Sequence, residues 1–238
     1  MIARDLREAL LDGVPDAPSG RVVVGINWVL VEGPDGAGLA HSPVRNAPGC
    51  RPIAHAGHLA GTSLRQLAEG MASDNPFEAA IAIAAANAHH NRRSVTGEDG
   101  NALEAAGREA RSTVVIGRFP GLDRSIPHAK VVERVPGPGD YPEAEAGRLI
   151  AEADLVVITA STIGNGTLPG LLALAQGRRV FLVGPGTPLA PALFARGIER
   201  LGGLVIADTD RAAQVLMEGG AVRGLRAAGR NVTLARPA

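Results

Sequence analysis

The second half of the chain alternates short apolar runs with segments of helical length, and this pattern restricts the fold more than any other feature. The runs are rich in Val, Ile and Leu at every position, which is typical of parallel strands buried on both faces beneath helices. Strands are predicted at Thr113–Gly117, Lys130–Val135, Leu155–Thr159, Arg179–Val183 and Gly203–Ala207, with an edge strand at Asn231–Leu234. Helices are predicted at Glu143–Ala153, Thr167–Ala175, Ala190–Leu201 and Asp210–Glu218. The pattern indicates a C-terminal, Rossmann-like parallel-sheet domain over residues 105–238.

The first half predicts a smaller domain of a different kind. Strands at Arg21–Val31 and Ala37–Ala40 would form a hairpin around the turn-forming sequence GPDG. Helices follow at Ser63–Gly70 and Asn75–Ala88, and the second begins with an Asn cap, a Pro and a Glu. A short amphipathic helix is predicted at the N-terminus, and a polar linker over residues 91–101. The sequence therefore predicts an α/β protein in which a small α+β domain, residues 1–104, precedes the parallel-sheet domain.

The charge balance and the aromatic content argue against nucleic acid as a partner. Acidic and basic residues number 24 each, the formal net charge is +0, and aromatic residues make up 3% of the chain. A nucleic-acid binder usually needs a basic surface and aromatic rings that stack on bases. Lys130 is the only lysine and begins a buried predicted strand. Pyridoxal phosphate, which needs a lysine Schiff base, is therefore disfavoured as a cofactor.

Cysteine usage and hydropathy indicate a cytoplasmic protein. Cys50 is the only cysteine, so no internal disulfide can form. The N-terminus carries charges from the fourth residue on, unlike a signal peptide. Residues 155–177 lack charge over a length that could span a membrane, but glycines, hydroxyl residues and Pro169 interrupt them. We therefore expect no membrane partner, and we expect a homodimer on base rates alone.

The stretch ITASTIGNGTLPG, from Ile158 to Gly170, is the first candidate for a ligand site. It joins a predicted strand to a predicted helix, at the sheet edge where α/β proteins bind ligands. The helix N-terminus would attract an anion, and the glycines would let a ligand approach the backbone. The side-chain donors are Thr159, Ser161, Thr162, Asn165 and Thr167. The alternative is a structural role, in which Asn165 or Thr167 caps the helix and the glycines form the turn.

A second loop and two carboxylates are expected at the same edge of the sheet. The sequence GPGTP follows the next strand and brings Gly184, Gly186 and Thr187 to the site. Glu133 and Asp140 would supply negative charge for a metal or a cationic group. The alternatives are that Thr187 caps a helix and that the carboxylates form salt bridges with Arg118 or Arg134.

Other cofactor and catalytic patterns are weaker. The dinucleotide pattern Gly-x-Gly-x-x-Gly is absent after the first strand, so a nicotinamide or flavin dinucleotide is disfavoured. Cys50, His55 and His58 are a candidate transition-metal set, with His89 and His90 downstream, but their spacing fits no known zinc pattern. The nucleophile pattern Gly-x-Ser-x-Gly does not occur.

Several motifs together resemble the heavy-metal chelation domain family of bacterial and archaeal proteins. They run along nearly the whole chain: Gly25-Ile-Asn27, Gly38-Leu-Ala40, Gly61 to Ala68, Asn75 to Ala80, Ala85 to Ala88, Ile116 to Phe119, Glu133 with Pro136, Gly139, Asp140 and Pro142, Thr159 to Thr167, and Gly184 to Leu189. The resemblance implies an enolase-N-terminal-like domain followed by a Rossmann-like domain. It also implies a cleft between them, lined by Glu133 and the loops Thr159–Thr167 and Gly184–Thr187. His55 and His58 depart from the family pattern.

The sequence leaves two functions open. The first is a cytoplasmic binding protein for a heavy metal, a metal chelate or a small anionic metabolite held in the cleft. The second is an enzyme, a transferase or lyase, that acts on a small metabolite in the same cleft. In the enzyme, Glu133 or Asp140 would be the general base and would need a pKa raised by burial.

Overall fold

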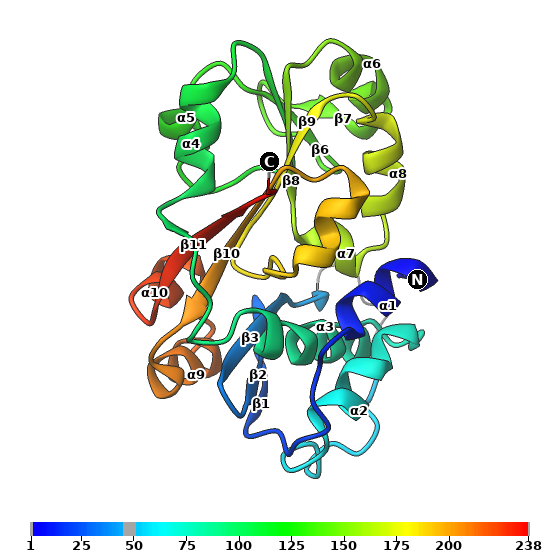
Figure 1. Ribbon diagram of the computed structural model, residues 1–238, viewed down its shortest axis with the longest axis vertical. Helices are drawn as coiled ribbons and strands as arrows, with labels where there is room; N and C mark the ends of the chain where they lie inside the picture. The colour runs from blue at the N-terminus through cyan, green and yellow to red at the C-terminus, as the bar shows by residue number, and fades with distance from the viewer. Residues whose placement is uncertain (1, 45–50, 238) are drawn as a thin grey trace.

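The computed structural model describes residues 2–44 and 51–237 and contains two β-sheets, one of three strands and one of eight (Figure 1). The three-stranded sheet is antiparallel and comes entirely from the first half of the chain. The eight-stranded sheet is mostly parallel and is flanked by helices. The predicted α/β class, with a small antiparallel sheet preceding a larger parallel one, is confirmed.

The large sheet has the strand order β4-β11-β10-β9-β8-β5-β6-β7. Its strands are β4 (Glu98–Asp99), β5 (Thr113–Ile116), β6 (Lys130–Glu133), β7 (Tyr141–Pro142), β8 (Leu155–Thr159), β9 (Arg179–Val183), β10 (Arg200–Ile206) and β11 (Gly229–Ala235). All neighbours from β10 to β7 pair in parallel, whereas β11 pairs antiparallel with both β10 and β4. The carboxyl ends of β5, β6, β8 and β9 therefore lie at one edge of the sheet.

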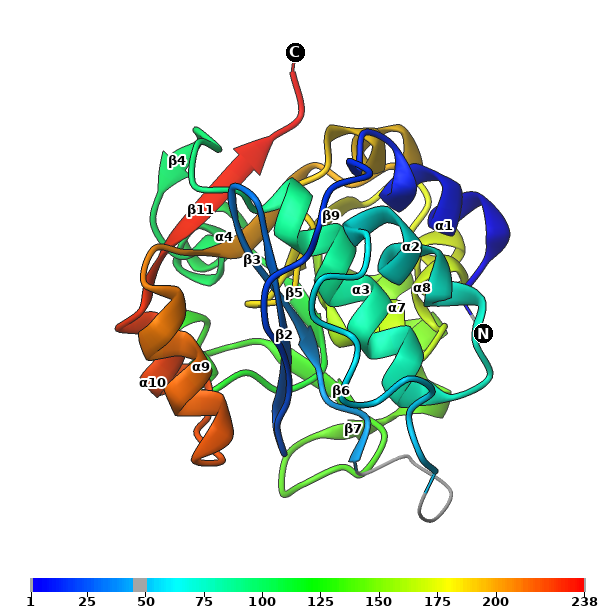
Figure 2. The ribbon, with the colours of Figure 1, turned by 90° about the horizontal axis from the view of Figure 1, so that it is seen from below.

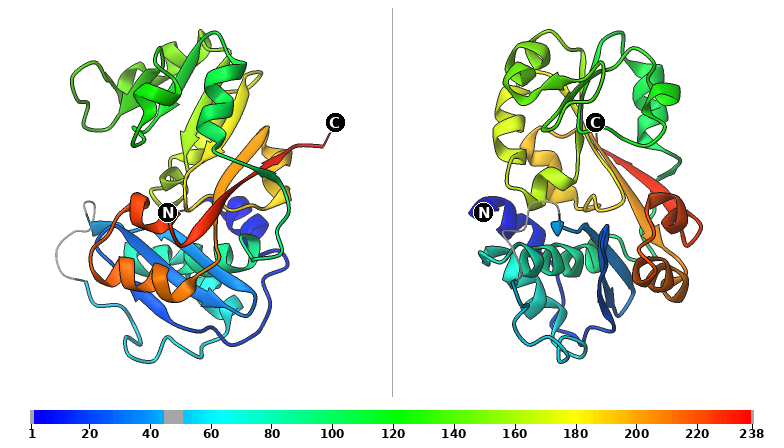
Figure 3. Two further views of the ribbon diagram at one scale, coloured as in Figure 1. Left: turned by 90° about the vertical axis from the view of Figure 1, so that its left-hand side faces the viewer. Right: turned by 180° about the vertical axis from the view of Figure 1, so that it is seen from behind.

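Helices cover both faces of the large sheet, as the back view in Figure 3 shows. One face packs on α4 (Ala102–Glu109) and α5 (Leu122–Ser125), and the other on α6 (Ala146–Ala151) and α8 (Leu168–Leu174). Side chains alternate between the faces, since successive residues of a strand point to opposite sides. The first core contains Val115, Leu155, Val157 and Phe181, and the second contains Val114, Ile116, Val156 and Ile158.

The remaining helices surround the small sheet and the junction between the two sheets. They are α1 (Arg4–Leu11), α2 (Leu64–Glu69), α3 (Pro76–His90), α7 (Ser161–Gly164), α9 (Thr209–Met217) and α10 (Val222–Arg226), with 3₁₀-helices η2 (Gly70–Ala72), η3 (Glu143–Glu145) and η4 (Pro191–Arg196). The predicted start of α3 is confirmed, because Asn75 Oδ1 accepts a hydrogen bond from Phe77 N at 3.1 Å and Pro76 is the first helical residue. In the part of the chain that the structure describes, no helix has the length and apolar character to cross a membrane.

The three-stranded sheet lies between α3 and α9, which Figure 2 shows from below. Its strands are β1 (Val22–Val24), β2 (Trp28–Gly33) and β3 (Gly36–His41). Val29 and Val31 face the core that contains α3, whereas Leu30 and Leu39 pack with α9 and the end of β10. Both faces of the small sheet are therefore buried, one by an early helix and one by a late helix of the chain.

Four local predictions were wrong. The predicted strand Arg21–Val31 is two antiparallel strands, because the chain reverses at Gly25, whose N–H donates to Trp28 O at 2.9 Å. The predicted helix Ala190–Leu201 is the shorter η4, which ends at Gly197 in a left-handed conformation before β10 begins. The strand predicted at the edge, Asn231–Leu234, pairs on both sides, because β4 lies in the segment expected as a linker. The loop after β8 contains a helical turn, α7.

Candidate functional site

A cavity of about 640 Å³ opens at the carboxyl ends of the parallel strands. We call it the strand-end cavity. One wall comes from the loops after β5, β6, β8 and β9, and the other from the segment before β2, the end of β3 and the start of α3. Its lining includes Asn27, His41, Pro76, Gly117, Arg118, Glu133, Arg134, Glu143, Thr159, Ser161, Thr162, Asn165, Thr167, Gly184 and Gly186. This is the edge at which α/β sheets bind ligands.

Glycines at the strand ends allow the loops to turn close to this wall. Gly117 has φ +90° directly after β5, and a Cβ at this position would lie 2.6 Å from Thr159 Cγ2. Gly184 has φ +138° after β9. Residues with a side chain rarely adopt these conformations, so glycine is required where the chain leaves the strand.

The last residue of β8 and the segment after it place the five predicted donors at the cavity, but their hydrogen bonds differ. Thr162 is buried, and its hydroxyl donates to Thr159 O at 2.6 Å. Thr159 Oγ1 lies 3.2 Å from Ser161 Oγ. Asn165 Oδ1 accepts from both the N–H and the hydroxyl of Thr167, at 3.0 and 2.7 Å. The amide nitrogen of Asn165 and the Ser161 hydroxyl are therefore better placed as ligand donors than Thr162.

The structure also shows the structural role that the sequence left open for this segment. Asn165 receives the backbone N–H of Thr167, immediately before α8, so it satisfies a group at the start of that helix. Thr167 itself makes no side-chain cap. Asn165 therefore both supports the start of α8 and lines the cavity.

The loop after β9 lines the cavity with two glycines, whereas the side chain of its threonine is buried in the protein interior. Gly184 and Gly186 line the cavity. Thr187 does not, because its side chain is fully buried and its carbonyl oxygen accepts from Asn91 Nδ2 at 2.9 Å. Neither the described lining of the cavity nor the cap of η4 includes the Thr187 side chain.

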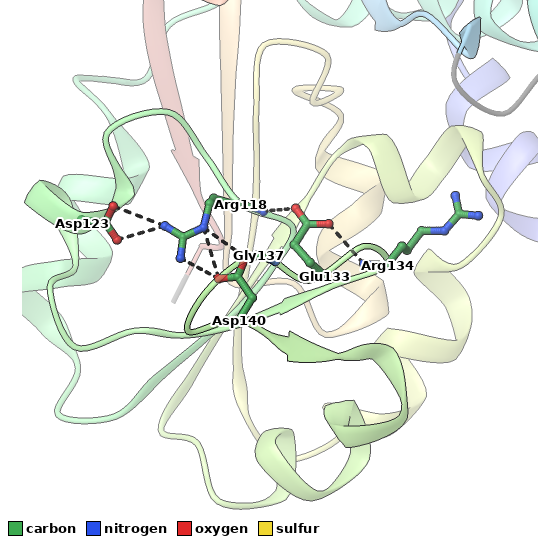
Figure 4. A network of polar contacts seen from close by, with 6 residues as sticks. All are labelled: Arg118, Asp123, Glu133, Arg134, Gly137 and Asp140. Atoms are coloured by element: carbon green, nitrogen blue, oxygen red, sulfur yellow. Dashed lines mark hydrogen bonds and ion pairs between the residues drawn. The ribbon is translucent and has the colours of Figure 1, made fainter.

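The two predicted carboxylates occupy different environments (Figure 4). Glu133 lines the cavity, and its carboxylate accepts from the backbone N–H groups of Arg118 and Arg134 at 2.6 and 3.2 Å. Asp140 lies outside the lining and forms an ion pair with Arg118, at 2.6 Å from Nη2. Its side chain is only 4% exposed and also accepts from Gly137 N at 3.1 Å. The salt bridge with Arg118 considered from the sequence is therefore present for Asp140.

Hydrogen bonds from Arg118 hold the pKa of the Asp140 carboxyl below its usual range against the effect of burial, with smaller contributions from the backbone N–H of Gly137 and from the charge of Arg118. Asp140 therefore lacks the raised pKa that a general base would need, because a carboxylate paired with a guanidinium favours its charged form. Arg118 also contacts Asp123 at 3.0 Å, so its guanidinium lies between two carboxylates. Both pairs raise the pKa of Arg118 above its already high value.

The sequence reasoning missed the contribution of the first half of the chain and of two arginines to the lining. His41 ends β3, and Pro76 begins α3, so both reach the cavity only through the packing of the small sheet against the large one. No local pattern marks such long-range neighbours. Arg118 directly follows Gly117 at the end of β5, and the strand-end rule could have identified it.

The candidate metal residues are dispersed in the described structure. His55 and His58 lie in an exposed turn, and Cys50 lies outside the described residues. His90 is buried beside His89, with its Nε2 at 2.9 Å from Leu10 O, and burial lowers its pKa to about 4. Within residues 2–44 and 51–237, no three His, Cys, Asp or Glu side chains lie close enough together to hold a metal.

The fold and the strand-end cavity define an α/β protein with a cavity at the carboxyl edge of its large sheet. Residues 7–90 match the DUF4213 domain and residues 101–235 match the DUF364 domain, both described as "Putative heavy-metal chelation". The chain belongs to this family.

Two solved structures from the DUF364 family are similar to the chain over nearly its whole length. The first, a protein of Desulfitobacterium hafniense DCB-2 with unknown function, is 30% identical, covers 98% of each chain and has a TM-score of 0.86. The second, from Pyrococcus horikoshii and also of unknown function, is 21% identical, covers 97% of this chain and 98% of its own, and has a TM-score of 0.81, which shows the shared fold. No curated protein sequence matches the chain.

Proposed function

We propose that the protein is a cytoplasmic binding protein whose strand-end cavity holds a small anionic metabolite or a metal chelate. The family descriptions support a small-ligand or metal-binding role. The observation that carries the proposal is the convergence of four strand-end loops with β3 and α3 on one cavity. In this proposal the chain divides into domains at residues 1–104 and 105–238, and the cavity is the cleft between them.

The donors in the cavity wall support an oxygen-rich, anionic ligand. Ser161, Thr159 and Asn165 offer hydroxyl and amide groups, and the glycine loops offer backbone N–H groups. Arg118 and Arg134 lie in the same wall as the carboxylates of Glu133 and Glu143 and offer guanidinium N–H groups to an acceptor. A volume of about 640 Å³ is in the range of cavities that hold metabolites.

The same wall is poorly suited to a directly coordinated heavy metal ion. Soft metals prefer thiolate and imidazole ligands, whereas the described lining offers one imidazole, at His41, and carboxylates at Glu133 and Glu143. Both oxygens of Glu133 already accept backbone N–H groups. A metal would therefore fit better as part of a chelate whose organic ligand supplies the coordinating atoms.

An enzyme acting on the same ligand is the second candidate, because Glu133 places a carboxylate in the cavity wall. Asp140 is not suited to the role of general base, since its pKa is lowered. The Glu133→Gln variant separates the two functions. An enzyme would keep its ligand and lose turnover, whereas a binding protein would lose affinity and show no product in either form.

The first test is to identify what the purified protein retains. Untagged protein, purified without chelator, is measured by inductively coupled plasma mass spectrometry for metal and by native mass spectrometry for an organic ligand. We expect a bound organic mass, with or without an equivalent of metal, that Ser161→Ala and Thr159→Val reduce. The matched controls Ser94→Ala and Thr96→Val change exposed residues outside the lining and should leave the bound mass unchanged.

Two results would count against the proposal. The first is a metal equivalent without any organic mass, which would indicate direct coordination. The second is a bound mass that the cavity variants and the control variants retain equally, which would place the ligand elsewhere.

A further inference from the structure

A second cavity of about 640 Å³ lies at the opposite end of β9 from the strand-end cavity. Its wall is formed by the last turn of α8, the start of β9, the end of η4 and the segment after β11. The charged residues of this wall are Arg178, Arg179, Arg196, Glu199 and Arg236. We call it the arginine-lined cavity.

Four guanidinium groups face one carboxylate in this wall, in a chain whose acidic and basic residues balance. Arg179 forms a two-point ion pair with Glu199, at 2.8 and 2.6 Å. The pKa of Glu199 is lowered against the effect of burial, first by the hydrogen bonds from Arg179. The charges of Arg200 and Arg236 lower it further. Among the described residues, the lining therefore has more guanidinium groups than carboxylates, although Asp5 pairs with Arg196 from outside it.

The other arginines use only part of their hydrogen-bonding capacity within the protein. Arg178 donates to the backbone carbonyls of Ala151, the last residue of α6, and of Ala153, which follows the helix. Arg196 contacts Asp5 through both terminal nitrogens, but its buried Nε has no hydrogen-bond partner among the described residues. Each guanidinium has five N–H donors, so these contacts leave donors for a further acceptor.

The side chain of Arg236 extends from an exposed position at the end of β11. Its backbone N–H donates to Glu199 O at 2.8 Å, which fixes the chain at the rim of the cavity. A guanidinium here can move onto a ligand without disturbing the core. Arginines gathered at an exposed rim are typical of sites that recognise phosphate or carboxylate groups by paired hydrogen bonds.

We propose that the arginine-lined cavity binds a small anion that carries two or more negative charges on phosphate or carboxylate groups. The site goes beyond the proposed function and is separate from the strand-end cavity, because β9 lies between them: Arg179 begins the strand and Gly184 follows its end. The helix α8 also joins the two sites, since Leu171 lines the first cavity and Leu172 lines the second.

Isothermal titration calorimetry on the full chain tests the proposal. The protein is titrated with pyrophosphate and, separately, with citrate, each at low and at high ionic strength. We expect one equivalent of at least one of the two anions to bind, and affinity to fall as added salt screens the charges. Arg236→Gln should weaken binding about fivefold to tenfold, and Arg236→Lys should weaken it less. The comparison of pyrophosphate with citrate shows whether phosphate or carboxylate is preferred.

Two control variants locate the bound anion. Arg226→Gln removes an exposed arginine of α10, outside this cavity, and should bind like the unmodified protein. Arg134→Gln changes the strand-end cavity, and a loss of binding in this variant alone would place the anion there instead. The proposal is overturned if neither anion binds, if Arg226→Gln weakens binding as much as Arg236→Gln does, or if only Arg134→Gln weakens it.

Discussion

The side-chain amide of Asn87, in α3, donates to the carbonyl oxygen of Gly186 at 2.9 Å, and so ties a helix of the first half of the chain to a loop of the strand-end cavity. The same nitrogen donates to Leu39 O at 2.7 Å. Asn87 is fully buried, so these bonds form away from water. One side chain therefore holds together β3, α3 and the loop after β9.

Replacing Asn87 with Ala should destabilise the protein by about 2 kcal/mol, because two buried carbonyl oxygens lose their donor. Urea denaturation measures the loss. Asn101→Ala is the comparison, since it removes one partly buried helix cap and should cost about 1 kcal/mol. Equal losses for the two variants would contradict the role given to Asn87.

Gly38→Ala should prevent stable folding. A Cβ on Gly38 would lie 2.1 Å from Ala84 O and 2.2 Å from Ala88 N, so β3 and α3 would have to separate. Gly170→Ala is the matched control, because a Cβ there meets nothing within 4 Å and the residue lies inside α8. This control should gain roughly 0.5–1 kcal/mol from helix propensity. Circular dichroism and thermal unfolding give both results, and a folded Gly38→Ala protein would show that the close approach is not required.

The protein should lose stability as the pH falls below about 6.5, because of His90. Burial lowers the pKa of His90 from 6.5 to about 4, so between these values the unfolded chain binds a proton that the folded chain does not. The free energy of unfolding should therefore fall by about 2 kcal/mol between pH 7.5 and pH 5 from this residue. Urea denaturation at several pH values measures it.

His90→Gln isolates this effect, since its amide can still donate to Leu10 O but does not titrate. Its stability should depend less on pH over the same interval. His128→Gln, at an exposed position, should keep the dependence of the unmodified protein. If His90→Gln and the unmodified protein share one pH profile, His90 does not contribute to it.

Arg118→Gln should raise the pKa of Asp140 toward its ordinary value, because the hydrogen bonds from Arg118 are the largest cause of the lowering. A lowered pKa contributes stability above the ordinary pKa of Asp, and this stability is lost as the pH falls through the folded-state pKa. The variant should therefore be less stable than the unmodified protein at pH 7, and the difference should shrink in acid. NMR titration of the Asp140 carboxyl carbon measures the pKa, with Arg124→Gln as the control.

The strands of the large sheet were predictable because burial on both faces selects continuous apolar runs. β8 and β9 begin and end where the sequence predicted. The reversal at Gly25 was not predictable from hydropathy, since the apolar run continues through β1 and β2. The edge strand β4 has the sequence Glu98–Asp99 and is a strand only because β11 pairs with it. Its pairing partner, not its own composition, determines its conformation.

The candidate site was predictable in part, because ligands of parallel α/β sheets bind at the carboxyl ends of the strands. The strand-end rule brought Glu133, the β8 segment, Gly184 and Gly186 to one cavity. It could not separate Thr187 from Gly186, because adjacent residues of a loop point in different directions and one is buried against Asn91. It left open whether Asp140 lines the cavity or pairs with Arg118, since this contact depends on the path of the loop after β6.

The position of the small sheet between α3 and α9 has a consequence for synthesis on the ribosome. Strands β2 and β3 emerge early, but Leu30 and Leu39 are covered by α9 and β10, which emerge near the end of the chain. At translation rates of about 5–20 residues per second, this apolar face stays uncovered on the order of ten seconds. The nascent chain should therefore be a substrate for ribosome-associated chaperones until the last helices are made.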